Sequence, residues 1–383
     1  LGWRYSYDEG IIMGLASYGN PNSKIPKNKK TYIQVFREII NYKNNLNINI
    51  DTDWITFHKE RDTWISEKFI KVFGKKRKYE NRLTQHHKDI AAALQLRLEE
   101  IVLHQLRFLK KKYKLSKLCL AGGVALNCSM NGMIAKSKIF DEIFVQPASS
   151  DAGLSIGAAI NCSLEFQPKK KLIFESNCYL GSRYSNLEIK KVINIFKNKV
   201  KIIRNKNIYN FASNVLMKQK IIGWFQGAAE FGPRALGNRS ILAAPSPTKI
   251  KDHINKNVKF RENFRPFAPA VLGEFASRYF NITQKSEYML IAFDVKPKMK
   301  KHVSATVHVD NTCRVQTVTK DSNKRFYNLL KMMYEKTNNP VLLNTSFNIK
   351  GQPIVNSPED AIKCFLKYKI DFLFIGDYIL QKK

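Results

Sequence analysis

Two segments in the first half of the chain each have the pattern of a buried strand, a glycine-containing loop and a helix start. The first runs from Lys117 to Asn127 with Gly122-Gly123 at its turn, and the second runs from Glu142 to Gly153. Repeated units of this kind favour an α/β domain, in which the loops gather at the ends of the strands. Glycines at such a turn let a ligand approach the backbone, and the helix start offers free amide groups to a nucleotide phosphate or ribose, but a Gly-Gly pair alone is a weak signal.

The length of the chain allows two domains, because 383 residues can form two separate cores. Residues 166–176 contain a proline and three consecutive lysines, which predicts a linker. We therefore expect a first domain over residues 1–165 and a second α/β domain over residues 177–383.

The second domain contains a stretch rich in glycine and arginine, from Gly223 to Ser240. A short apolar strand pattern leads into it, and Arg234 and Arg239 stand beside glycine and proline. A solvated basic surface would be mostly lysine, whereas the planar guanidinium group suits bidentate recognition of phosphate or carboxylate. Lys259, Arg261 and Arg265 follow shortly after, so residues 223–269 predict a site for a small anion.

The chain is strongly basic, with 65 Lys and Arg against 31 Asp and Glu and a formal charge of +34. Such a charge suggests a polyanionic partner, either nucleic acid or an anionic membrane. Lys, Asn and Ile are abundant throughout, however, which indicates a general compositional bias. No zinc-finger spacing or aromatic RNA-binding pattern accompanies the charge, so we do not expect nucleic acid as the partner.

Cysteine and histidine spacing gives no metal or disulfide pattern. The six cysteines contain no close pair, which favours free thiols in a reducing compartment. We expect a cytoplasmic protein, because no apolar run reaches the length of a membrane span and no signal peptide is visible. His86 and His87 are adjacent and have no partner four residues away, so we interpret them as structural or surface residues.

Asp151 has two interpretations. Aspartate is favoured at the N-cap of a helix, and a helix is expected to begin near this residue. Its carboxylate can equally face a metal ion or the phosphates of a nucleotide bound at the Gly122-Gly123 turn. The residues themselves leave both interpretations open.

Three local patterns predict further elements. Apolar residues from Ile90 to Leu106 recur at helical spacing and predict an amphipathic helix of about six turns. Residues 306–318 predict two strands about an Asp310-Asn311 turn, with Arg314 and Gln316 on one face. Ser357 to Asp360 has a capping-box pattern that begins the last helix.

Seven motifs, in order along nearly the whole chain, resemble those of the O-carbamoyltransferases of nodulation factors and antibiotics. They lie at residues 14–19, 121–127, 151–153, 230–240, 261–269, 314–317 and 344–348. This resemblance implies a partial actin-type ATPase domain, similar to that of the tRNA threonylcarbamoyl-transferring proteins, followed by a YrdC-like domain that binds carbamoyl phosphate. The implied reaction passes the carbamoyl group to ATP, forms a carbamoyl adenylate, and transfers the group to a hydroxyl of a sugar or natural product.

The resemblance also implies roles for individual residues. Gly122, Gly123 and Asn127 would bind ATP, and Asp151 would bind a divalent metal, either iron or magnesium. The residues implied as catalytic, around carbamoyl phosphate, are Arg234, Lys259, Arg265 and Arg314. The further substrate contacts expected are Arg239, Arg261, Asn344 and Ser346.

One feature departs from the family pattern. The family carries a histidine pair spaced HxxxH in its amino-terminal half, and His86, His87 and His104 do not match it. Because the chain also starts with Leu1, we expect the carboxy-terminal part of a longer enzyme, with the half-domain supplied by a partner chain or a homodimer. The alternatives are a tRNA-binding protein related to tRNA-modification enzymes and a non-catalytic partner subunit.

Overall fold

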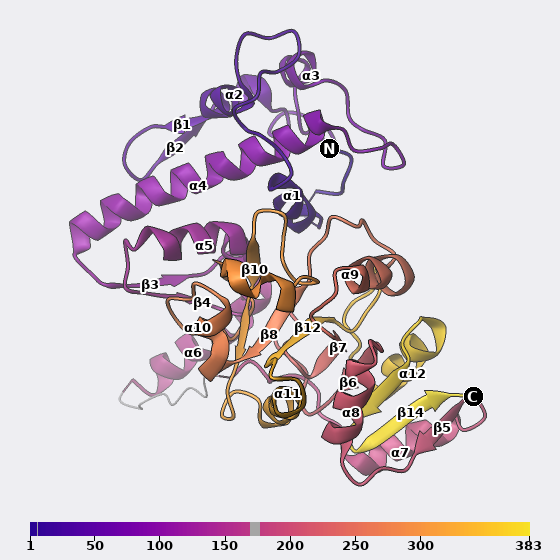
Figure 1. Cartoon of the computed structure of the whole chain (residues 1–383). Coiled ribbons are helices and arrows are strands. Elements are labelled where there is room, and N and C mark those ends of the chain that lie inside the picture. The colour runs from indigo at the N-terminus through magenta and orange to yellow at the C-terminus, as the bar shows by residue number, and fades with distance from the viewer. Residues whose placement is uncertain (6, 169–176) are drawn as a thin grey trace. The chain divides into compact units, whose positions relative to one another are not determined.

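The computed structural model describes residues 1–5, 7–168 and 177–383, and most of the predicted linker lies outside these residues. The chain divides into two compact units, which are coloured along the sequence in Figure 1. Unit 1 comprises Leu1–Leu118 and Ser129–Ile143, and unit 2 comprises Cys119–Cys128 and Phe144–Lys383. Each unit is described below by itself.

Unit 1 is mainly helical. Its elements are α1 (Glu9–Ala16), α2 (Tyr32–Ile39), β1 (Ile40–Tyr42), β2 (Ile48–Ile50), η1 (Thr52–Trp54), α3 (Glu67–Phe73), α4 (Gln85–Tyr113) and most of α5 (Cys128–Ser137). The Thr31 hydroxyl accepts the Gln34 N–H, and the Gln34 side chain accepts the Thr31 N–H, so a capping box starts α2. Aromatic side chains of Tyr32, Phe36 and Phe73 then pack into the core of the unit.

Helix α4 is longer than the sequence pattern predicts, with 29 residues. Ile90, Ile101 and Leu106 are buried as expected, but Leu94 is 37% exposed. Arg97, a charged residue within this helix, is also buried, because its guanidinium donates to the Ile40 carbonyl and to Glu100. Hydrogen bonds therefore override the apolar periodicity at this position.

The two adjacent histidines at the start of α4 have structural partners. The Nε2 of His86 donates to the Phe73 carbonyl at 2.7 Å, and its Nδ1 contacts the Tyr32 hydroxyl. The Nδ1 of His87 accepts the backbone N–H of Thr84 at 3.1 Å and completes the helix cap. The structural interpretation of this pair is confirmed.

Unit 2 is built on an eight-stranded mixed sheet with the order β11-β8-β12-β7-β6-β13-β14-β5. Its strands are β5 (Val200–Ile203), β6 (Ile222–Phe225), β7 (Arg239–Ala243), β8 (Ala268–Leu272), β11 (Gln316–Val318), β12 (Val341–Ser346), β13 (Phe372–Ile375) and β14 (Tyr378–Lys382). Outside this sheet, β9 (Ala292–Asp294) pairs with β10 (Thr312–Arg314), and β3 (Lys117–Leu120) pairs with β4 (Glu142–Val145). The expected α/β class is thus observed, with one large sheet.

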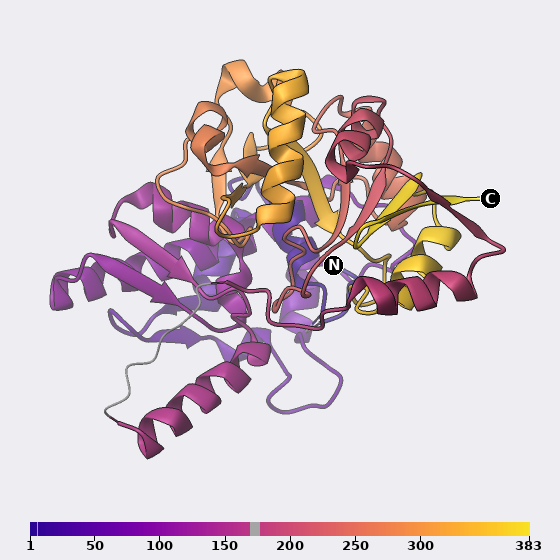
Figure 2. The ribbon, with the colours of Figure 1, turned by 90° about the horizontal axis from the view of Figure 1, so that it is seen from below.

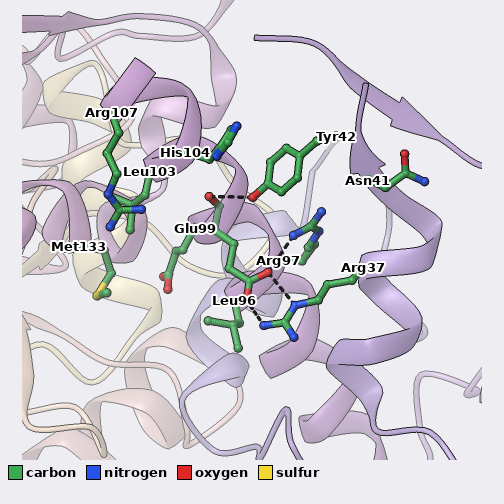
Figure 3. Close-up of a pocket in the computed structure, with 11 residues that line it drawn as sticks. Arg37, Asn41, Tyr42, Leu96, Arg97, Glu99, Leu103, His104, Arg107 and Met133 are labelled. Atoms are coloured by element: carbon green, nitrogen blue, oxygen red, sulfur yellow. Dashed lines mark hydrogen bonds and ion pairs between the residues drawn. The ribbon is translucent and has the colours of Figure 1, made fainter. Parts of the chain in front are cut away.

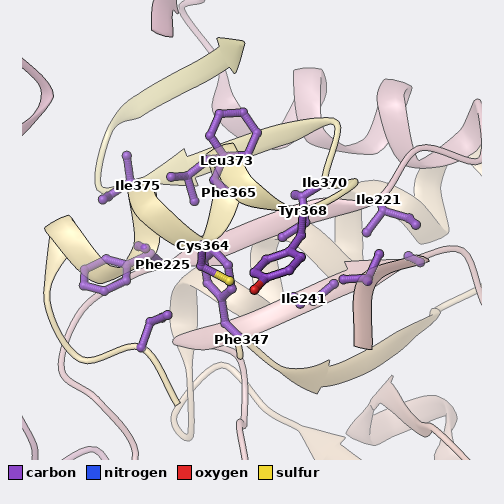
Figure 4. Packing of buried hydrophobic residues seen from close by; sticks show 14 of the residues in the cluster. Ile221, Phe225, Ile241, Phe347, Cys364, Phe365, Tyr368, Ile370, Leu373 and Ile375 are labelled. Atoms are coloured by element: carbon purple, nitrogen blue, oxygen red, sulfur yellow. The ribbon is translucent and has the colours of Figure 1, made fainter. Parts of the chain in front are cut away.

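Helices cover both faces of the large sheet (Figures 1 and 2). Helices α8 (Ile208–Met217) and α11 (Lys324–Thr337) pack on one face, while α7 (Asn186–Ile195), α9 (Lys249–Ile254) and α12 (Pro358–Lys367) pack on the other. Alternation within the strands supplies both cores, since Trp224 belongs to the first and Phe225, its neighbour, to the second (Figure 4). The predicted capping box starts α12, with Ser357 as N-cap and Asp360 as its partner.

The prediction of two strands about an Asp310-Asn311 turn is right for the turn and wrong for the first strand, because residues 306–311 form no strand. Residues 312–314 form β10 and residues 316–318 form β11, and these strands pair with β9 and β8. A tight turn precedes β10, because Asp310 accepts the Thr312 N–H at 3.0 Å and Asn311 has a φ of 67°. That turn uses the residues that the first strand of a hairpin would need.

Helix α6 (Leu154–Phe166) differs from the other long helices because none of its residues is buried. Leu154 is 69% exposed and Phe166 is 79% exposed. The neighbouring β3 was expected to be buried, but Cys119 is exposed, as is Phe144 on β4. Apolar side chains of α6, together with Phe144 on β4, are therefore uncovered in the part of the chain that the structure describes.

Two further findings concern the cysteines and the apolar helices. All six cysteines are free thiols. Among the described helices, none combines the length and apolar character needed to cross a bilayer.

Candidate anion site in unit 2

The register of the large sheet brings four segments to one of its ends. Strand β12 is antiparallel to both β7 and β8, with Ser346 opposite Ser240 and Asn344 opposite Ala268. Strand β11 runs parallel to β8, with Gln316 opposite Ala270. The carboxyl end of β12 and the amino ends of β7, β8 and β11 therefore meet. Arg265 precedes β8 and Arg314 precedes β11, so both lie at this end.

The loop between β6 and β7 carries Arg234 and is held by Glu230. One carboxylate oxygen of Glu230 accepts the backbone N–H groups of Leu236 at 2.6 Å, Asn238 at 2.8 Å and Arg239 at 3.2 Å. Burial raises the pKa of Glu230, although these hydrogen bonds favour its ionised form. A single buried carboxylate thus fixes the loop that presents Arg234.

Gly237 makes this loop possible. Its φ is 106°, a conformation that side chains other than glycine rarely adopt. A Cβ at this position would lie 2.3 Å from Cδ1 of Phe326, which is fully buried on α11. The loop can therefore follow this path only because position 237 has no side chain.

The pKa values show that the cations of this region lie together. Burial, the largest cause, acts together with the positive charges of Arg314 and Arg265 to lower the pKa of Arg234 to about 9. Burial, followed by Arg265 and Arg314, lowers the pKa of Arg261 well below its usual value. For Lys259, burial and the charges of Arg261 and Arg265 act in the same way. Together these five residues, Arg234, Lys259, Arg261, Arg265 and Arg314, form what we call the cation cluster.

The cluster holds more positive charge than its ion pair offsets. Glu262 lies 3.8 Å from Arg265 and 3.4 Å from Lys350, so it supplies a carboxylate at one edge. The Nε atoms of Arg234 and Arg314 are buried and have no hydrogen-bond partner among the described residues. Burying like charges without partners costs free energy, so this arrangement favours an anionic ligand.

Lys259 is the cluster member most occupied by protein groups. Lys259 is 3% exposed. Its ammonium group donates to the carbonyl oxygens of Ser346 at 2.6 Å and Asn348 at 2.9 Å. It also donates to the side-chain oxygens of Ser346 at 3.1 Å and Asn348 at 2.7 Å. These contacts tie η4 (Asn255–Lys259) to the end of β12. Lys259 therefore shapes the site through Ser346 and Asn348 and also adds its charge.

Arg239, expected as a substrate contact, is part of the framework of the loop. It is fully buried and donates to the carbonyl oxygens of Gln226 at 2.7 Å, Asn238 at 3.1 Å and Ser182 at 2.9 Å. Its guanidinium also stacks on the Phe225 ring at 3.7 Å. The structure does not bring Arg239 into the cation cluster, because backbone carbonyls accept from both of its Nη atoms and the Phe225 ring covers its guanidinium group.

Two other predicted substrate contacts, Arg261 within the cluster and Asn344, already have protein partners. The Nε of Arg261 donates to Asn255 at 2.8 Å, and its guanidinium packs on the Phe267 ring. The Asn344 amide donates to the Ala235 carbonyl at 3.2 Å and to the Gln316 side chain at 2.9 Å. Its side-chain oxygen is buried and has no partner among the described residues.

Gln316 is a residue that the sequence did not single out for this site. Its amide donates to the Leu236 carbonyl at 2.8 Å while its oxygen accepts from Asn344. It thereby connects β11, β12 and the loop that carries Arg234. The predicted alternation that placed Gln316 beside Arg314 was the available signal.

The predicted nucleotide-binding turn is open. Gly122 has a φ of 95°, and no heavy atom lies within 4 Å of a Cβ built at Gly122 or at Gly123. The Gly122 N–H donates to the Ser149 carbonyl at 2.7 Å, and the Asn127 N–H donates to Val124 at 2.9 Å. A ligand can thus approach the backbone here, but the geometry does not single out a nucleotide.

Asp151, the predicted metal ligand, is exposed and begins the short helix η3 (Asp151–Gly153). Ser150 is the N-cap of η3 and Gly153 is the N-cap of α6, so the N-cap interpretation of Asp151 is wrong. In the described ranges, no three His, Cys, Asp or Glu side chains are grouped so that they could hold a metal ion. The described residues therefore do not form a complete metal site.

Two sequence models of one family match the chain. The carbamoyltransferase N-terminus matches residues 1–160, and the carbamoyltransferase C-terminus matches residues 213–382. The chain belongs to the carbamoyltransferase family. The C-terminal match includes every member of the cation cluster.

Curated relatives are more than a third identical to the chain within the aligned region. It is 38% identical to the nodulation protein NolO of Bradyrhizobium diazoefficiens, over 98% of this chain and 66% of that protein. It is 37% identical to the nodulation protein NolNO of Sinorhizobium fredii, over 98% of this chain and 53% of that protein. The chain therefore spans less than two thirds of the length of these relatives.

Solved structures give a weaker likeness. A crystal structure of HypF in a phosphate- and nucleotide-bound form is 12% identical, with a TM-score of 0.32 over 46% of this chain and 22% of that chain. This likeness is too small to bear on the fold or the function.

Proposed function

We propose that the chain binds carbamoyl phosphate in the cation cluster and acts in ATP-dependent transfer of the carbamoyl group to a hydroxyl of a sugar or natural product. The convergence of Arg234, Arg261, Arg265 and Arg314 with Lys259 at one end of the sheet carries this proposal. Membership of the carbamoyltransferase family supports it.

The cluster suits the chemistry of carbamoyl phosphate. The substrate is a small dianion, and negative charge grows on its phosphate oxygens as the bond to the carbamoyl carbon breaks. Fixed guanidinium groups in a partly buried site stabilise that charge without having to reorganise. Arg265 and Arg314 would bind the phosphate, while the Asn344 side-chain oxygen would accept a hydrogen bond from the carbamoyl amino group.

The proposal also assigns an ATP-binding site and a domain family to each half of the chain. Water would release phosphate from carbamoyl phosphate, and the resulting carbamate would displace pyrophosphate from ATP to form a carbamoyl adenylate, with Gly122, Gly123 and Asn127 at the nucleotide. Residues 1–165 would then belong to an actin-type ATPase domain and residues 177–383 to a YrdC-like domain. The open backbone at Gly122 and Gly123 fits this assignment.

The proposal also includes a second polypeptide. The uncovered apolar side chains of α6 and β4 would be buried by a partner chain or by a second copy that completes the first domain. Exposed apolar surface of this kind commonly marks a protein interface.

Calorimetric titration with freshly prepared carbamoyl phosphate tests the anion site. We expect Arg265→Gln to weaken binding by roughly tenfold or more, because a charge-assisted hydrogen bond contributes about 1.5–3 kcal/mol. Arg278→Gln is the matched control, since Arg278 is exposed and follows β8 at the end of that strand away from the cluster. Equal affinities for the two variants would refute the assignment of the site.

A further inference from the structure

Unit 1 contains a groove that the proposed reaction does not use. It has a volume of about 610 Å³, within the range of small-molecule sites, and lies between the α2–β1 segment and α4 (Figure 3). The residues that line this groove, which we call the α4 groove, are Arg37, Asn41, Tyr42, Leu96, Arg97, Glu99, Glu100, Leu103, His104, Arg107 and Met133. All of them belong to unit 1.

One wall of the α4 groove is held rigid by an ion-pair network. Glu100 accepts from Nε of Arg37 at 3.1 Å and from Nη1 of Arg97 at 2.8 Å, and Arg97 also donates to the Ile40 carbonyl at 2.8 Å. Burial opposes ionisation of Glu100, but the two arginines outweigh it and lower its pKa. The charges of this wall are therefore mutually satisfied and serve to fix its shape.

The same wall carries a fixed aromatic stack. The Arg97 guanidinium carbon lies 4.8 Å from the centroid of the Tyr42 ring, and the centroid of the His104 ring lies 4.2 Å from it. The Tyr42 hydroxyl donates to the Glu100 carbonyl at 3.3 Å. The stack thus gives the α4 groove a preformed edge that needs little ordering when a ligand binds.

Arg107 is the free charge of the α4 groove. Its side chain is exposed and forms no ion pair or hydrogen bond with any residue that the structure describes. Glu99, which also lines the groove, accepts from the Gln95 amide at 2.8 Å. Three arginines and two glutamates line the groove, so one positive charge is in excess, and Arg107 is the one of the three arginines without a partner among the described residues.

Apart from Asn41, the rest of the lining is apolar. Leu96, Leu103 and Met133 lie along it, and Met133 is 39% exposed. The hairpin continues this surface, because Ile48 pairs with Tyr42 and is itself 39% exposed. A ligand that meets both Arg107 and these side chains needs a charged end and an apolar body.

We propose that the α4 groove binds an amphipathic organic anion, in which one carboxylate or phosphate is attached to an apolar body. Arg107 contacts the anionic group, while Leu103 and Met133 contact the body. Such a ligand differs from carbamoyl phosphate, which has no apolar part. The proposal is independent of the reaction assigned to the cation cluster.

Titrations of the whole chain with octanoate and octyl phosphate test this proposal and distinguish the two anionic groups. We expect at least one of them to bind in a 1:1 ratio and more tightly than either acetate or octan-1-ol, which have only the charge or only the body. Arg107→Gln should weaken binding roughly threefold to fivefold, as expected for loss of an exposed charge contact. Met133→Gln should weaken it while leaving acetate unaffected.

Lys111→Gln supplies the matched control, since Lys111 is an exposed cation on the same helix outside the lining. It should leave the affinity unchanged, and circular dichroism should show equal helix content in all three variants. The proposal is overturned if Arg107→Gln and Lys111→Gln bind alike, if acetate binds as tightly as octanoate, or if neither octyl compound binds.

Discussion

Replacement of Gly237 by alanine is the sharpest test of how the fold supports the cation cluster. A Cβ at this position would lie 2.3 Å from Cδ1 and 2.6 Å from Cγ of Phe326, far inside contact distance. The positive φ of 106° adds backbone strain for any residue other than glycine. Phe326 is fully buried and packs among α8, α11 and the sheet, so it cannot move without disturbing that core.

The expected loss of stability follows from these two contributions. Backbone strain contributes about 1–2 kcal/mol and overpacking about 1–3 kcal/mol, so Gly237→Ala should lower the free energy of unfolding by about 3 kcal/mol. With a urea dependence of about 3 kcal/mol per molar, the transition of unit 2 should move about 1 M lower. The same change should weaken phosphate binding, because the displaced loop carries Arg234.

Trp224 offers a local probe for this measurement. It is fully buried, belongs to the same core as Phe326, and is the tryptophan of unit 2. Its ¹⁹F resonance after incorporation of 5-fluorotryptophan, followed through a urea titration, reports the unfolding of that core. Gly157→Ala on α6 is the control, because no heavy atom lies within 4 Å of its Cβ and helix propensity predicts a gain of about 0.5–1 kcal/mol. An unchanged midpoint for Gly237→Ala would show that the reasoning about this close approach is wrong.

Three further perturbations have defined outcomes. Affinity for inorganic phosphate should fall as the pH rises through about 9, where Arg234 loses its proton. In a calorimetric pH series, Arg234→Gln should flatten that decline. An unchanged slope would contradict the role of Arg234 in binding. Because the folded chain holds the Glu230 proton more tightly than the unfolded chain, this group's contribution to stability should decrease as the pH rises above 4.5, the usual pKa of glutamate. Urea titrations of Glu230→Gln should lack that decrease. Leu154→Glu with Phe166→Glu should reduce any self-association seen by light scattering if a second copy covers α6, and unchanged association would exclude that surface.

Local patterns made much of unit 2 predictable. The capping box that begins α12 joins Ser357 and Asp360, which lie three residues apart, so the start of this helix follows from the sequence alone. The apolar runs of β12 and β13 are buried on both faces and could be recognised as strands for the same reason. Arginines placed beside glycine and proline indicated the anion site, and the structure brings Arg234, Arg265 and Arg314 together.

Contacts between distant residues could not be predicted in this way. The acceptors of Lys259 lie 87 and 89 residues later in the chain, and a carbonyl that holds Arg239 lies 57 residues earlier. Nothing in the residue types tells a guanidinium that binds a ligand from one that binds backbone carbonyls. The same limit applies to the uncovered surface of α6, since apolar side chains there look identical in sequence to those of a buried helix.

The central position of β12 ties the integrity of the cation cluster to strand alignment. This strand is hydrogen-bonded to β7 on one side and to β8 on the other. A shift of a single residue would turn Asn344 to the opposite face of the sheet and would draw the acceptors of Lys259 away from its ammonium group. Insertions and deletions within residues 341–346 should thus abolish anion recognition even where every arginine is retained.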